Sequence, residues 1–288
     1  MSWPKLLGIS LAFFVSWPGG RTYARALILE AVRGRTTIIT ASGSALRADP
    51  GYKFKVGDQI ITTASAKLRL DLNQGVIILT GNSRAAVQEL STQKGGARTT
   101  LRLYRGNLWA SLRRFTNPYS LFLVHGPQGT IYKVRGTQFS AFTDGKTNLM
   151  AVDQGSVQAE NSQGGVFVGA GFGVAAPPGQ GPNLPTRTKS IPSLEDFRVE
   201  RQGAYWRIQG KLKLRSHLVG TPYFLEQPIQ NATLKLGARR VNLESDRFDF
   251  RIKAAPAPRS LPLLGNETFL KGEINGHPLT EKIFPRPL

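Results

Sequence analysis

The chain has 288 residues, a formal net charge of +20 and no cysteine. Because 40% of its residues are hydrophobic, it can bury the core of one large domain or two ordinary ones, which excludes a disordered tail. The lack of cysteine excludes a disulfide framework, thiol chemistry and a cysteine-ligated metal. The basic excess favours an anionic partner, with a general solubility charge as the alternative.

The N-terminal residues have the pattern of an export signal. Lys5 precedes an apolar run from Leu6 to Trp17 that is too short to cross a bilayer comfortably. A Pro-Gly-Gly turn and the site Ala24-Arg25-Ala26 follow, so residues 1–26 are expected to be a cleaved signal peptide, with an uncleaved anchor as the alternative. Export predicts a periplasmic or secreted protein of a bacterial envelope and argues against nucleic acid as a partner.

Residues 27–170 are predicted to form an all-β domain. Short runs alternate apolar and polar residues between Gly, Asn or Asp, as in AKLRLDLNQGVIIL (66–79). Strands this short, spaced eight to twelve residues apart, are typical of a sandwich, a barrel or an irregular β-solenoid. The segment SRAAVQEL (83–90) fits a short helix as well as a strand.

The C-terminal third is predicted to be a separate β-rich unit. Residues 171–192 are dense in Gly and Pro and are expected to form an extended linker that lies partly on the first domain. Residues 193–288 return to alternating strands, and Asn275-Gly276 is their strongest hairpin signal. A length of this order fits a small antiparallel β-sandwich.

No catalytic or metal-binding constellation is apparent in the sequence. His125, His217 and His277 are far apart and have no metal-ligand spacing. The carboxylates that could form a glycosidase pair occupy turn-like or outward strand positions; they are Asp49, Asp58, Asp71, Asp144, Asp153 and Glu160. We therefore expect no enzyme activity and no cofactor.

A basic stretch without acids is the best candidate for binding. Between Glu89 and Asp144 the chain carries Lys94, Arg98, Arg102, Arg105, Arg113, Arg114, Lys133 and Arg135, interleaved with Tyr104, Trp109, Tyr119 and Tyr132. Guanidinium forks suit phosphate and carboxylate, and flat aromatic rings suit sugars. The first six cations are the candidate binding residues. Alternatively, these strands show a basic face to solvent and bury their aromatic rings.

Three motifs occur along the chain in the same order as in a known family. They are Val56-Gly57-Asp58, the V-R-G-T-x-F segment from Val134 to Phe139, and the V-x-x-G-x-V segment from Val152 to Val157. Over about residues 30–175 the chain resembles FecR-domain proteins. The resemblance implies an exported, solenoid-like β domain. In iron-uptake FecR proteins this domain receives a signal from an outer-membrane receptor, and a cytoplasmic segment acts on a sigma factor. We expect this chain to lack that segment.

The residues Val134, Arg135, Gly136, Thr137 and Phe139 also have a physical interpretation. An uninterrupted strand would place Arg135 on the same face as Phe139. A β-bulge at Gly136 would let Val134 and Phe139 both point inward. Arg135 would then be buried beside a kink, where we expect it to pair with Asp153 on a neighbouring strand.

These observations predict a non-enzymatic, exported FecR-domain protein that binds a partner in the cell envelope. The partner would be a receptor protein or an anionic polymer such as peptidoglycan or lipopolysaccharide, contacted by the basic stretch. Three alternatives stay open: a structural component of an extracellular assembly, a part of an iron-uptake signalling system that acts with separate proteins, and a carbohydrate-active enzyme.

Overall fold

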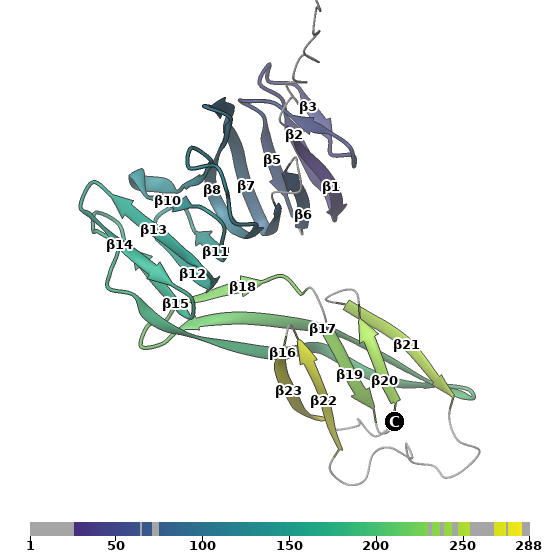
Figure 1. The fold of residues 1–288 in the computed structure, drawn as a ribbon. Coiled ribbons are helices and arrows are strands. Elements are labelled where there is room, and N and C mark those ends of the chain that lie inside the picture. The colour runs from purple at the N-terminus through teal and green to yellow at the C-terminus, as the bar shows by residue number, and fades with distance from the viewer. Residues whose placement is uncertain are drawn as a thin grey trace, which may run out of the picture.

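The computed structural model describes residues 26–63, 65–70, 75–229, 232–236, 239–243, 247–253, 268–274 and 276–283. These residues are almost entirely β-strand, and their single helical element is the 3-10 turn η2 (Pro127–Gly129) (Figure 1). The predicted all-β class is confirmed. Residues 1–25 of the predicted signal peptide lie outside the described residues.

The first unit contains strands β1 to β15. Their bounds are β1 (Leu27–Arg33), β2 (Thr36–Ile39), β3 (Ala45–Arg47), β4 (Lys53–Phe54), β5 (Gln59–Thr62), β6 (Ser65–Leu70), β7 (Gly75–Gln93), β8 (Gly96–Leu112), β9 (Leu121–His125), β10 (Ile131–Val134), β11 (Gln138–Thr143), β12 (Asn148–Gln154), β13 (Ser156–Asn161), β14 (Gly164–Gly169) and β15 (Phe172–Ala176).

This unit is one hydrogen-bonded sheet that folds over into two layers. The first part of β7 pairs with β6 and its second part with β5, while the first part of β8 pairs with β9 and its second part with β11. Layer 1 therefore runs β3-β2-β5-β7-β8-β9-β10-β13-β14. Layer 2 runs β4-β1-β6-β7-β8-β11-β12-β15. Only the β8–β9 pairing is parallel in the described sheet.

The two layers share one hydrophobic core. Layer 1 contributes Phe122 and Val134, and layer 2 contributes Ile77, Phe139 and Val152; all five are fully buried. The rings of Phe122 and Phe139 meet across the layers, with their centroids 6.4 Å apart. Burying a side chain of this size contributes about 1.5–3 kcal/mol, so the alternation of apolar residues fixes which face of each layer points inward.

Residues 83–90, which fitted either a helix or a strand, belong to β7. Ala85 and Val87 are buried in the shared core, whereas Arg84 and Gln88 are exposed. The segment pairs antiparallel with both β5 and β8, so the helix alternative is wrong for this segment.

The chain crosses between the layers at corners, and three of them contain a glycine with positive φ. Gly57 (φ +95) lies between β4 and β5, Gly136 (φ +116) between β10 and β11, and Gly155 (φ +80) between β12 and β13. Other residues rarely adopt these angles because a Cβ atom would clash with the backbone. The glycines of all three sequence motifs therefore occupy crossings.

Gly136 packs directly against the segment that joins β8 to β9. A Cβ atom at this position would lie 2.3 Å from Arg114 Cα and 2.8 Å from Arg114 N. The predicted bulge is instead a corner between two separate strands, because residues 135–137 leave the ladder. The corner still has the expected effect on facing, since Val134 and Phe139 are both fully buried.

The second unit contains two facing sheets. Their strands are β16 (Thr186–Gln202), β17 (Tyr205–Leu218), β18 (Phe224–Gln227), β19 (Ala232–Leu236), β20 (Arg239–Leu243), β21 (Arg247–Lys253), β22 (Thr268–Ile274) and β23 (His277–Ile283). Strands β16, β17, β18 and β21 pair with one another, and β20-β19-β22-β23 form the second sheet. Leu212, Leu214, Leu234, Phe248 and Ile274 belong to the core that they share.

The chain connects the first unit to the second through strands as well as loop residues. The predicted linker, residues 171–192, contains β15 and the start of β16. β15 pairs with β12, and β16 adds to β15 at Thr186 and Arg187 before it continues into the second unit. The domain boundaries drawn from the sequence remain predictions.

Replacing Gly136 by alanine should destabilise the protein by about 2–5 kcal/mol, because it adds backbone strain and overpacks the contact with Arg114. Urea denaturation followed by circular dichroism measures this loss in the free energy of unfolding. Gly129→Ala is the matched control, because Gly129 also has positive φ (+73) but no atom lies within 4 Å of a Cβ there. Equal losses for both variants would contradict the close packing at Gly136.

Candidate functional site

The second unit covers one end of the outer face of layer 2, at β8, β11, β12 and β15. Leu218 of β17 and Leu225 of β18 pack against Leu149, Ala151 and Ala175. Figure 1 shows β18 running beside β12 and β15. All five side chains are at most 2% exposed, so this part of the face is an internal contact rather than a binding surface.

Polar groups complete the contact between the two units. The Gln227 side-chain amide donates to Asp153 Oδ1 at 3.0 Å and to Ser216 Oγ at 2.6 Å. The Asn107 amide donates to the backbone carbonyl of Glu226. Burial raises the pKa of Asp153, although hydrogen bonds from Gln227 and Trp109 partly offset this effect.

The predicted pairing of Arg135 with Asp153 is wrong. Arg135 is exposed, and its guanidinium donates to the backbone carbonyl of Pro118. Asp153 points away from the shared core, because its neighbour Val152 points inward, and it lies in the contact with the second unit. The two side chains therefore make different contacts, and Arg135 does not form a buried ion pair.

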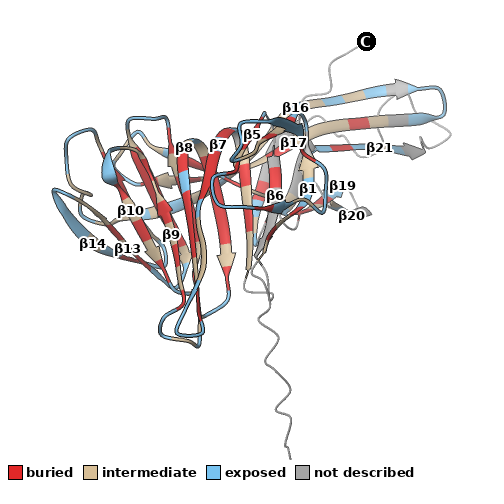
Figure 2. Ribbon diagram, turned by 90° about the horizontal axis from the view of Figure 1, so that it is seen from above, coloured by how far each residue is buried: buried red, intermediate tan, exposed pale blue. Residues whose placement is uncertain are grey.

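The outer face of layer 1 remains accessible to solvent. We call it the open face and define it by seven half-buried or exposed side chains on three adjacent strands: Arg98, Arg102, Leu121, Leu123, His125, Ile131 and Lys133. Arg102, His125 and Ile131 follow one another across β8, β9 and β10, and Thr100, Leu123 and Lys133 form the next row. Exposed and half-buried positions alternate with buried ones along these strands in Figure 2.

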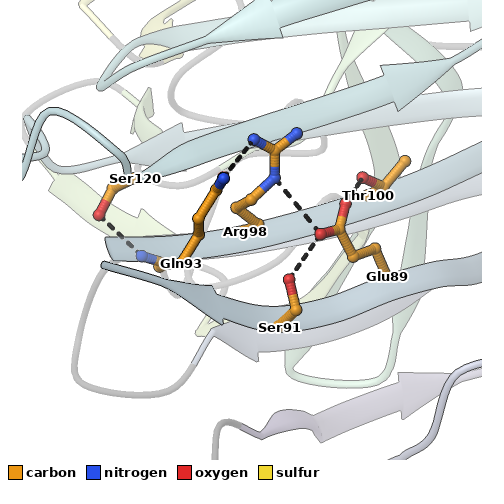
Figure 3. Close-up of polar contacts among 7 residues, drawn as sticks. Glu89, Ser91, Gln93, Arg98, Thr100 and Ser120 are labelled. Atoms are coloured by element: carbon orange, nitrogen blue, oxygen red, sulfur yellow. Dashed lines mark hydrogen bonds and ion pairs between the residues drawn. The ribbon is translucent and has the colours of Figure 1, made fainter. Parts of the chain in front are cut away.

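Arg98 is held in place by a polar cluster at one side of the open face (Figure 3). Its Nε lies 3.3 Å from Glu89 Oε1, and its Nη1 donates to Gln93 at 3.0 Å. Ser91 and Thr100 also donate to the Glu89 carboxylate. The hydrogen bond from Ser91 is the largest of the effects that lower the pKa of Glu89. Arg98 is thus largely neutralised within the protein.

Arg84 and Arg102 lie on the ring of Tyr104, with guanidinium carbons 5.1 and 5.2 Å from its centroid. Such cation–π contacts orient a guanidinium without removing its charge. In the described part of the chain neither arginine forms an ion pair, although Arg84 donates to Gln59 at 2.9 and 3.2 Å. Arg102 therefore presents uncompensated charge to the open face.

The other two basic groups of the open face add little net charge. Lys133 Nζ lies 2.6 Å from Glu160 Oε1 on the adjacent strand β13. Burial, and then the charge of Arg102, lowers the pKa of His125. His125 is therefore uncharged near neutral pH. The result is a mixed surface, with leucine and isoleucine side chains between a few charged groups.

The six predicted binding residues do not form one site. Arg98 and Arg102 lie on the open face, whereas Lys94 lies at the tip of the β7–β8 hairpin, with its Nζ 4.9 Å from the centre of the Tyr119 ring. Arg105 lies at the bend of β8, and Arg113 and Arg114 lie in the crossing to β9.

Of the aromatic rings interleaved with the cations, two are buried. Trp109 lies under the second unit and Tyr132 in the shared core, at 4% and 2% exposure. Neither ring is available to stack on a sugar. Tyr104 is half-buried beneath two arginines, and Tyr119 is exposed beside Lys94.

Asp58 of the first motif is a structural residue. It is buried, and its carboxylate accepts hydrogen bonds from Ala41 N (2.9 Å), Lys55 N (2.8 Å) and the Tyr52 hydroxyl (2.8 Å). Burial and the contact with Asp58 raise the pKa of Tyr52 to about 12. The preceding Gly57 donates to the Val87 carbonyl, so this corner joins the β2–β3 turn to β7.

The second and third motifs touch each other. Thr137 Oγ1 donates to the Ser156 carbonyl at 2.9 Å. A Cβ atom at Gly155 would lie 3.0 Å from both Gly136 O and Thr137 Oγ1. The two crossings are therefore adjacent and closely packed, and the motif residues here build the fold.

The residues missed by the sequence analysis are the apolar members of the open face, Leu121, Leu123 and Ile131. LFLVH and IYKV alternate as strands do, so their outward positions could be read from the sequence. The alternation does not show which outward-facing side chains are covered by other parts of the folded chain. Among the described residues, no cluster of three or more His, Asp or Glu side chains could hold a metal, and no helix is long and apolar enough to span a membrane.

Comparison with known families identifies this part of the chain. Residues 58–158 match the family model described as FecR protein. This segment is a FecR domain. No curated protein matches the chain. Two crystal structures of a candidate anti-sigma factor from Parabacteroides distasonis ATCC 8503 resemble it at 14% identity, with TM-scores of 0.36 and 0.38. They cover 43% and 45% of this chain, which spans 56% and 59% of theirs.

The FecR domain extends from Asp58 at the first corner into β13. It contains the whole open face and the two adjacent crossings at Gly136 and Gly155. Val56, which is 52% exposed, and Gly57 lie just before the matched segment. The open face and the motif corners are thus separate features of one FecR domain.

Asp153→Asn should be tolerated at pH 7, because asparagine keeps an acceptor for Gln227 without a buried charge. Since the folded pKa of Asp153 is raised, its charge costs stability above that pKa, and the cost disappears as the pH falls through it. The melting temperature of the variant relative to the natural protein should therefore decrease from pH 7 to acid pH. A difference independent of pH would contradict the burial of this carboxylate.

Proposed function

We propose that the chain is a non-enzymatic, exported FecR-domain protein that binds a protein partner in the cell envelope through its open face. One observation carries this proposal. The second unit covers the outer face of layer 2 at β12 and β15, whereas no such cover lies over β8, β9 and β10 of layer 1 among the described residues. The open face of layer 1 keeps its leucine and isoleucine side chains accessible.

The composition of the open face favours a protein over an anionic polymer. Glu89 and Glu160 neutralise Arg98 and Lys133, and His125 is uncharged near neutral pH. Polymer binding by scattered cations would require these charges to be free. Leu121, Leu123 and Ile131 around one unpaired arginine are typical of a protein interface, where apolar contacts surround a few oriented polar groups.

The match to the FecR family model also supports a second role, as part of an iron-uptake signalling system that acts with separate proteins. In that role the partner would be an outer-membrane receptor. Peptidoglycan and lipopolysaccharide, the polymer partners expected from the basic charge, become controls in the binding experiment.

The purified protein, immobilised and exposed to solubilised envelope proteins, should retain a partner at both low and high salt. Raising the salt from about 0.1 M to about 1 M shortens the Debye length from about 10 to about 3 Å, which removes binding by scattered charges. Retention at both salts indicates an apolar protein contact. Loss at high salt, together with co-sedimentation with peptidoglycan or lipopolysaccharide at low salt, would contradict the proposal.

Leu123→Glu should abolish retention without unfolding the protein, because Leu123 lies at the centre of the open face and is only half-buried. Leu184→Glu is the matched control, since Leu184 is 81% exposed and lies outside the FecR domain. If both variants retain the partner as the natural protein does, the open face is not the contact.

A further inference from the structure

Strand β14 (Gly164–Gly169) forms one end of layer 1. Among the described strands it pairs only with β13, so one row of its backbone donors and acceptors faces away from the sheet. Figures 1 and 2 both place it at one end of the first unit.

Other edge strands of this chain carry features that oppose pairing with another chain. β16 contains Pro192, a bulge between Glu195 and Arg198, and Asp196 with a positive φ of 50. β3 has only three residues. In contrast, β14 has the sequence GGVFVG, without charge, proline or bulge. Proteins usually protect such an edge, so its exposure favours a function in pairing.

The side chains of β14 divide between the two faces of layer 1. Val168 is fully buried, and Val166 packs against the shared core. Phe167, which lies between them, is 74% exposed. A strand added to this edge would extend the core on the inner side and cover Phe167 on the outer side.

The sequence of β14 indicates what that added strand is. Residues 165–169 read Gly-Val-Phe-Val-Gly in both directions. In an antiparallel pair centred on Phe167, each residue meets an identical or mirror-related residue, and inner-face valines meet inner-face valines. We propose that two copies of this chain associate through antiparallel pairing of their β14 strands, with Phe167 on the two-fold axis.

Charge near β14 is consistent with this symmetric pairing. A charged residue on a two-fold axis would face its own copy, and residues 164–169 contain none. The nearest carboxylate on the neighbouring strand, Glu160, is paired with Lys133. The net charge of +20 opposes association at long range, but it is screened beyond about 8 Å at physiological salt. The dimer should therefore strengthen as salt is added.

Sedimentation velocity of the purified protein over a range of concentrations measures this association. The natural protein should dimerise, whereas Phe167→Glu and Phe167→Lys should each weaken the dimer about tenfold or more, because like charges face each other. Mixing the two variants should restore a dimer, since glutamate then faces lysine. A natural protein that stays monomeric up to about 100 µM, far above a micromolar affinity, would overturn the proposal. A mixture that fails to restore association would also overturn it.

Cross-linking tests the register independently. The chain has no cysteine, so Phe167→Cys introduces one thiol that can form a disulfide only with its copy. Mild oxidation should give a covalent dimer in high yield. Leu184→Cys is the control, because Leu184 is even more exposed but lies outside β14. Equal yields for the two variants would reflect random collision and would contradict the pairing.

Discussion

The structure depends on the chain crossing between two β-layers where there is no room for a Cβ atom. The crossings at Gly136 and Gly155 lie side by side, and each packs against the backbone of another segment. Each requires a backbone conformation that glycine adopts readily. Because of these crossings, Val134 and Phe139 both reach the same core from different layers.

The two outer faces of the layers have different roles. The second unit covers the β12 and β15 end of the outer face of layer 2 with Leu218 and Leu225 and with the polar contacts of Asp153. The outer face of layer 1 is left for an external contact, and β14 at its end is left for a second copy. The FecR motif residues lie at the crossings between the layers, which explains why Asp58, Gly136 and Thr137 hold the fold together and do not reach the open face.

Much of this architecture follows from the local sequence. Alternating residues predicted the strands, and the facing of Val134 and Phe139 required a break at Gly136. The sequence could not reveal which outward residues become covered, because Trp109 and Leu123 both alternate with core residues in the same way. That difference arises from the distant strand β18, which alternation within one strand does not report. The pairing assumed for Arg135 failed for the same reason, since the partner of Asp153 is Gln227, 74 residues away.

The charges counted along the sequence also did not predict the charge of the folded surface. The stretch between Glu89 and Asp144 contains no acid, yet Glu89 and Glu160 lie beside Arg98 and Lys133 once the strands pair. Strand pairing therefore places acidic side chains next to the cations of this basic segment. Among the described cations of the open face, only Arg102 has no ion pair. The open face therefore presents one unpaired arginine among apolar side chains, while the binding role of the predicted cations outside this face stays a prediction.

A double-mutant cycle tests most directly whether the adjacent crossings act as one unit. Urea denaturation gives the free energy of unfolding for Thr137→Ala, Gly155→Ala and the double variant. Because a Cβ atom at Gly155 would press on Thr137 Oγ1 at 3.0 Å, the Gly155 substitution should cost less, by about 0.5–1 kcal/mol, when Thr137 has been shortened. An equal cost in both backgrounds, within about 0.3 kcal/mol, would show that the crossings are independent and would contradict this account.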